Sequence, residues 1–132
     1  MAILEGFLTK AIASLAGAVS EFAAARYDNC ANRCYYACFQ AAIYALANEG
    51  IRSRSSQDYW EHDFVRSQFA GLLVNRRKIY PVELRNILES NYSLRRMGDY
   101  EERRVGQVQA RRALERSYQF IGMIQERGGR EP

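Results

Sequence analysis

The helical spacing of apolar residues constrains this fold more than any other feature of the sequence. Apolar residues recur every three or four positions in successive segments, and no stretch alternates apolar and polar residues as a half-buried strand would. The segment from Leu4 to Phe22 carries one such stripe, which includes Val19. A second begins at Cys30 and is the most apolar, with Asp28 and Asn29 expected to cap its N-terminus. Both segments predict amphipathic or buried helices.

Three further segments show the same spacing. We expect a helix from Tyr59 to Val74 and another from Pro81 to Arg96. Pro81 suits the start of the latter, because proline at the first helical position loses no hydrogen bond. Gly98 is expected to end the fourth helix, and Asp99 to Gly106 to be irregular. The inward side of the last helix is expected to carry Ala110, Leu114, Tyr118, Ile121 and Ile124.

The segments together predict an all-α, antiparallel four- to five-helix bundle. The chain has 132 residues, enough for one domain with its own core, and no linker rich in glycine or proline divides it. We expect residues 1–127 to form this domain, with a surface loop from Ile51 to Asp58 and a disordered tail over residues 128–132.

The cysteines argue against both disulfides and a metal. Cys30, Cys34 and Cys38 are the three cysteines of the chain, and an odd number suits a reducing compartment. Cys30 and Cys38 would lie about 12 Å apart along a helix axis, too far to share one ion, and the chain has one histidine. We expect buried packing roles for the cysteines, no metal and no cofactor.

The N-terminus lacks the features of a signal peptide. Glu5 stands where a basic region belongs, and no apolar run reaches the roughly 18 residues needed to cross a bilayer. The sequence predicts a cytoplasmic protein without a membrane partner.

The formal net charge of +4 is carried almost wholly by arginine, which includes several adjacent pairs. The planar guanidinium group suits phosphates, so an anionic partner such as nucleic acid fits this composition. Solvated helix faces carry the same residues, and composition leaves both interpretations open.

Two places carry candidate chemistry. His62 is the single histidine, so it is the one side chain whose ordinary pKa suits acid–base work near neutral pH, although a lone histidine at a helix end is more often a packing residue. Arg95 and Asp99 are four residues apart and would touch if the helix continued, with Tyr100 next to them. They form either a surface ion pair or a phosphate-binding guanidinium beside an oriented carboxylate and phenol.

An ordered set of short motifs runs through most of the chain. It begins with Arg26-Tyr27-Asp28 and continues with Ala31-Asn32-Arg33, Tyr35-Tyr36-Ala37, Phe39 and Ala41-Ala42. It goes on with His62 and Phe69, Tyr80-Pro81-Val82-Glu83-Leu84, Leu94-Arg95 and Asp99-Tyr100. In order and spacing this set resembles the HEPN superfamily, in its UPF0332-like branch, and the resemblance covers about Arg26 to Glu126.

The resemblance implies a helical bundle that forms a two-fold dimer. Many members are metal-independent ribonucleases, often toxins encoded beside a minimal nucleotidyltransferase antitoxin, and others are noncatalytic binding modules. Arg95 matches the family's arginine, but Asp99 stands where the nuclease histidine would fall, as in the Arg-x-x-x-Asp-Tyr motif of the branch. The resemblance therefore implies Arg95, Asp99, Tyr100 and His62 as candidate catalytic residues, and Arg95, Arg96 and Arg33 as candidate RNA- or nucleotide-binding residues.

Three functions stay open at this point. The chain is a toxin–antitoxin or defence protein that acts on RNA or binds a nucleotide in an arginine-lined dimer cleft, with endoribonuclease activity unsettled because the histidine is missing. Alternatively, it is a noncatalytic module that docks a minimal nucleotidyltransferase or another partner. The third possibility is a helical scaffold whose arginines only keep it soluble.

Overall fold

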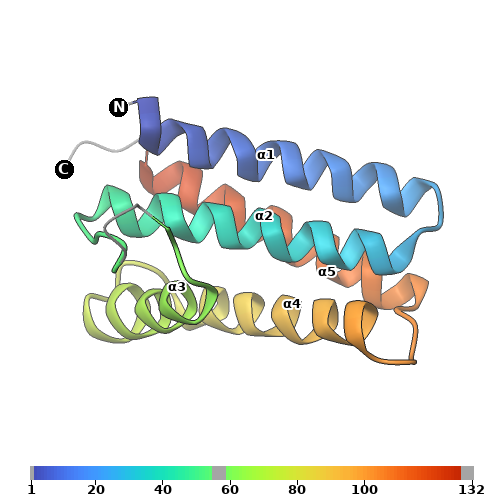
Figure 1. Ribbon diagram of the computed structural model, residues 1–132. Helices are drawn as coiled ribbons and strands as arrows, with labels where there is room; N and C mark the ends of the chain where they lie inside the picture. The colour runs from blue at the N-terminus through green and yellow to red at the C-terminus, as the bar shows by residue number, and fades with distance from the viewer. Residues whose placement is uncertain (1, 55–58, 129–132) are drawn as a thin grey trace.

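The apolar segment at the centre of the sequence pattern is also the centre of the fold. The computed structural model describes residues 2–54 and 59–128, which hold helices and no strand. Helix α2 (Tyr27–Asn48) contacts every other helix, and Figure 1 shows it between α1 and α4, with α5 beside it. The other elements are α1 (Ala2–Ala23), α3 (His62–Gln68), the π-helix η1 (Phe69–Arg76), α4 (Val82–Tyr100) and α5 (Gln107–Gly128).

These elements confirm the predicted all-α bundle and correct its details. The expected tail is part of α5 at Gly128, and residues 129–132 lie outside the described part, as do residues 55–58 of the expected loop. The third helix begins at His62 rather than Tyr59 and continues as a π-helix, a widening that the apolar spacing did not reveal. None of the helices in the described ranges is long and apolar enough to cross a membrane.

The prediction that Asp28 and Asn29 cap the second helix is wrong. The helix begins before them at Tyr27, with Arg26 at the cap position and no side-chain capping bond. Asp28 accepts a hydrogen bond from the Val105 backbone N–H at 2.8 Å instead, which fastens the segment before α5 to the start of α2. A long-range contact thus takes the oxygen that a local cap would have used.

Helix α4 differs from its prediction at both ends. Pro81 is extended at the cap position, so the helix begins one residue later, at Val82. Gly98 does not end the helix, which continues to Tyr100. A Cβ on Gly98 would lie 3.2 Å from Asp28 Oδ1 and 3.2 Å from Val105 Cγ2. Glycine therefore allows close packing here and is not a stop signal.

The core has two parts that share α2. A larger cluster includes Tyr35, Phe69 and Phe120, and a smaller one is built from small residues such as Cys30 and Ala113. All three cysteines are buried and free, as predicted. Two residues placed inward by the apolar spacing are exposed instead: Val19 at 39% and Tyr118 at 56%. Ala18 and Ser117, the residues just before them, are the buried ones.

Candidate functional site

Arg95, in the last turns of α4, is held from two sides. Its Nε donates to Asp99 Oδ2 at 3.1 Å, which confirms the contact expected from their spacing. Its Nη2 donates to the Tyr36 hydroxyl oxygen at 3.3 Å, from α2. The side chain of Arg95 is 14% exposed. The ion pair within α4 is thus largely covered, and the Tyr36 hydroxyl ties it to α2, so the guanidinium is held in one orientation.

Three tyrosine rings surround this guanidinium. Its central carbon lies 5.3 Å from the ring centroid of Tyr35, 5.2 Å from that of Tyr36 and 5.7 Å from that of Tyr100. Cation–π attraction at these distances strengthens as water is excluded. Asp99 Oδ2 also accepts a hydrogen bond from Asn32 Nδ2 at 3.0 Å, so α2 holds the carboxylate as well as the arginine.

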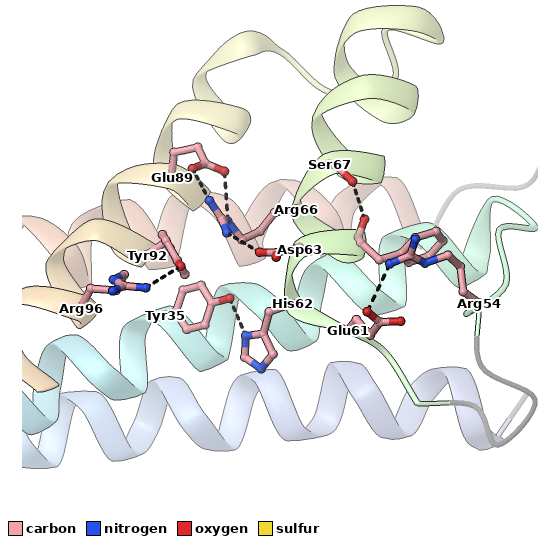
Figure 2. Close-up of polar contacts among 11 residues, drawn as sticks. Tyr35, Arg54, Glu61, His62, Asp63, Arg66, Ser67, Glu89, Tyr92 and Arg96 are labelled. Carbon is pink, nitrogen blue, oxygen red and sulfur yellow. Dashed lines mark hydrogen bonds and ion pairs between the residues drawn. The ribbon is translucent and has the colours of Figure 1, made fainter. Parts of the chain in front are cut away.

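His62 joins the same cluster of rings from the first turn of α3. Its ring stacks on Phe39 at a centroid distance of 4.1 Å. Its Nδ1 lies 2.8 Å from the Tyr35 hydroxyl, the contact drawn in Figure 2. Burial lowers the pKa of His62, and the positive charges of Arg95 and Arg66 lower it further. The imidazole is therefore neutral near neutral pH.

The surroundings of Tyr35 decide where the histidine carries its proton. Tyr35 is fully buried, and burial raises the pKa of its phenol, so the hydroxyl stays protonated. His62 Nδ1 is the polar group paired with that hydroxyl among the described residues. A buried hydroxyl that lacks an acceptor is costly, so Tyr35 donates and His62 accepts at Nδ1. The proton of the neutral imidazole then lies on Nε2, which makes this atom a donor and not a base.

Arg66 fastens α3, and with it His62, to α4. Its guanidinium donates twice to the Glu89 carboxylate, at 3.2 and 2.7 Å, and stacks on Tyr92 at 3.6 Å (Figure 2). Arg96 donates to the Tyr92 hydroxyl at 3.2 Å from the next turn of α4. These contacts hold the histidine and Arg95 in a fixed relation.

The fold brings together four of the residues singled out in the sequence. Arg95, Asp99 and Tyr100 form one cluster, and His62 meets it through Tyr35 and Tyr36. Arg96 lies at its edge, with its guanidinium 5.7 Å from the Tyr100 ring. We use the name Arg95 cluster for the following residues: Asn32, Tyr35, Tyr36, Phe39, His62, Arg95, Arg96, Asp99 and Tyr100.

Arg33 is not part of this cluster. It lies against Gly17 of α1, and its charge acts on Glu21, on another side of α2. The sequence did not single out Tyr35, Tyr36 and Asn32 as site residues. A signal existed, because Asn32 and Tyr36 are four apart and so share one face of α2.

No group of three histidine, cysteine or acidic side chains that could hold a metal ion occurs in residues 2–54 and 59–128. Burial raises the pKa of the Cys38 thiol to about 12, so it stays protonated as a packing residue would.

Comparison with known families gives one match. The HEPN domain matches residues 4–127, almost the whole chain. The match does not separate the branches of that family, so the UPF0332-like assignment stays a prediction. No curated protein matches the sequence.

Proposed function

The chain belongs to the HEPN family, and on that premise we propose that it binds RNA through the Arg95 cluster, as a protein of the toxin–antitoxin or defence type. One observation carries the proposal: Arg95 is fixed among three tyrosine rings at the point where Tyr100, 67% exposed, reaches solvent beside Arg96. An exposed aromatic ring beside guanidinium groups is the arrangement on which unpaired bases stack.

The roles within the cluster follow from exposure. Arg95 is largely covered and paired with Asp99, so it contributes positive charge and positions Tyr100 without offering a free fork. Arg96 is exposed, and its guanidinium carbon lies 5.9 Å from the ring centroid of Tyr92 and 5.7 Å from that of Tyr100. In this proposal Arg96 contacts the phosphate and Tyr100 stacks on a base.

The same geometry favours binding over cleavage. Attack by a 2′-hydroxyl needs a base to take its proton, and a second group to protonate the leaving oxygen. The His62 proton lies on Nε2 while Tyr35 holds Nδ1, so the imidazole offers no free lone pair. Asp99 Oδ2 already accepts hydrogen bonds from Arg95 and Asn32. We therefore assign Asp99 and His62 positioning roles.

A two-fold dimer belongs to this proposal because it would place two Arg95 clusters along one strand. Sedimentation of the purified protein at micromolar concentration measures it. A dimer is expected, and a monomer would leave each cluster as a separate single-strand site without a shared cleft.

Binding of a labelled single-stranded RNA, followed by fluorescence anisotropy at several salt concentrations, tests the function. We expect the affinity to fall steeply with salt. Tyr100→Ala should weaken it about tenfold or more, as loss of one base stack does, and Arg96→Gln should flatten the salt dependence. Arg85→Gln is the matched control, because Arg85 lies on the same helix and bonds Asn75 far from the cluster.

The result that would overturn RNA binding also identifies the alternative. A folded protein that binds no RNA but forms a stable complex with a minimal nucleotidyltransferase would be the noncatalytic interaction module. Degradation of a mixed RNA pool in EDTA that stops in both Arg95→Ala and Asp99→Ala would instead establish a ribonuclease with a carboxylate in place of the histidine.

A further inference from the structure

A groove of about 590 Å³ runs between α4 and α5, away from the Arg95 cluster. Ser90, Ser93, Leu94 and Met97 line it from α4, while Arg112 and Arg116 line it from α5. The α4 residues recur at three and four positions, whereas Tyr92, Arg95 and Asp99 occupy the opposite side of the helix. The two regions are therefore separate surfaces.

We propose that this groove binds an organic phosphate monoester, with the guanidinium groups of Arg112 and Arg116 as the donors that hold the phosphate.

The first argument is the way Arg116 is held. Its Nε donates to the amide oxygen of Asn91 at 3.1 Å. Asn91 is fully buried, and its Nδ2 donates to Ser117 Oγ at 3.0 Å and to Cys38 Sγ at 3.4 Å. The amide can therefore offer only its oxygen to Arg116. A neutral, buried group thus fixes the arginine and leaves the two terminal nitrogens of its fork for a ligand.

The second argument is the balance of charge in the groove. The two carboxylates that line the groove are already in ion pairs, Glu89 with Arg66 and Glu101 with Arg103. Within the described ranges, neither Arg112 nor Arg116 has a carboxylate partner. The two lie one helical turn apart, a spacing at which like charges repel. Burial lowers the pKa of Arg116, and the charge of Arg112 acts in the same direction. A doubly charged anion between the two guanidinium groups would relieve this repulsion.

The third argument is the size and lining of the groove. A bare phosphate would fill a small part of about 590 Å³, a volume in the range of sites for small organic ligands. Ser90 and Ser93 offer hydroxyl groups opposite the arginines, and Leu94 and Met97 offer apolar surface. This combination fits a phosphate ester with an organic body, such as a sugar phosphate or a nucleotide, better than inorganic phosphate.

Titration of the ¹⁵N-labelled full chain with inorganic phosphate, ribose 5-phosphate, AMP and adenosine tests the proposal. Saturable shifts are expected for the backbone amides of Ser90, Ser93 and Gln109 with both phosphate esters, and only weaker shifts with inorganic phosphate. If AMP binds much more tightly than ribose 5-phosphate, the ligand is a nucleotide. If the two bind with equal affinity, the ligand is a sugar phosphate. Absence of shifts with both esters, or equal shifts with AMP and adenosine, would overturn a phosphate site.

Variants locate the anion. Arg112→Gln should weaken ester binding roughly tenfold to a hundredfold, the loss expected for hydrogen bonds to a charged group. Arg116→Lys should also weaken it, because lysine keeps the charge but not the fork. Arg111→Gln is the matched control, since Arg111 is adjacent in sequence but stacks on Phe22 outside the groove. Unchanged affinity in Arg112→Gln would contradict the proposal.

The proposal does not depend on RNA binding by the Arg95 cluster. Tyr100→Ala should leave the ester affinity unchanged, and Arg112→Gln should leave the stacking effect of Tyr100 on RNA affinity unchanged. Failure at one surface is thus distinguishable from failure at the other.

Discussion

The two flanks of α4 hold their arginines in opposite ways. On one flank Arg95 has a carboxylate partner, Asp99, and three tyrosine rings around it. On the other flank Arg116 is anchored by the neutral amide of Asn91, beside the like charge of Arg112. An arginine whose charge is balanced inside the chain works as part of the structure. One that is fixed but unbalanced is prepared for an anion from outside.

Because of this difference, substitutions on the two flanks should change the stability of the protein by different amounts. Removal of Asn91, the neutral anchor, should disturb the core. Removal of Arg95, the paired arginine, should lower the free energy of unfolding, and removal of Arg112, which has no carboxylate partner, should change it very little. Four predictions follow this order, from the largest effect to the smallest.

Asn91→Ala should lower the free energy of unfolding by about 3 kcal/mol, because it leaves a buried void and deprives Arg116 and Ser117 of their partner. Urea unfolding measures the change. Ser90→Ala, an exposed neighbour on α4, should stay within about 0.5 kcal/mol of the wild type. Similar values for the two variants would mean that the amide does not anchor the arginine.

Arg95→Ala should lower the free energy of unfolding by about 2 kcal/mol, since the ion pair and the contacts with the rings are lost together. Arg112→Ala should change it by less than about 0.5 kcal/mol, because the loss of one charge relieves repulsion of Arg116. Thermal unfolding of the two variants, measured side by side, compares their losses of stability. Equal losses would remove the contrast between the flanks.

Gly98→Ala should destabilise the protein by about 1 kcal/mol, although alanine is the better helix former by a similar amount. The added Cβ would press on Asp28, whose carboxylate is already committed to the Val105 N–H. Gly122→Ala on α5, where a Cβ meets nothing within 4 Å, is the control and should be neutral or stabilising. Stabilisation by both substitutions would show that the last turn of α4 has room to adjust.

The sequence predicted what depends on local spacing. The helical segments and the contact of Arg95 with Asp99 follow from periods of three and four, and the structure confirms both. Gly98 and Asp28 were misread because each serves a tertiary contact with Val105 that competes with its local preference. The rings of Tyr35 and Tyr36 around Arg95 depend on the packing of α2 on α4, which periodicity does not fix.

The groove of Arg112 and Arg116 was beyond prediction for a related reason. The sequence offers these residues among many arginines. They are distinguished by having no ion pair with a carboxylate within the described ranges, although Glu89 and Glu101 line the same groove. That property depends on which carboxylates Arg66 and Arg103 engage, and so on the relative rotation of the helices.

The smallest effect concerns pH. The pKa of His62 in the folded chain lies below its ordinary value of 6.5, so the unfolded chain binds the proton more readily. Stability from this group is fully present above about pH 6.5 and is lost as the pH falls through the folded pKa. Acidification from pH 7.5 to pH 5 should thus destabilise the wild type more than His62→Gln, which keeps an acceptor for Tyr35 but does not titrate.

The same measurement compares the flanks of α4, because the charged groups that act on His62 are Arg95, Arg66 and Asp63. Arg95→Ala removes one of the two positive charges that lower the pKa, so its stability should fall less on acidification. The stability of Arg112→Ala should fall on acidification by the same amount as that of the wild type. Urea unfolding at the two pH values gives each difference, in which the carboxylates that neither Arg95 nor Arg112 contacts cancel. An equal loss in Arg95→Ala and Arg112→Ala would show that the charge of Arg95 does not reach the histidine.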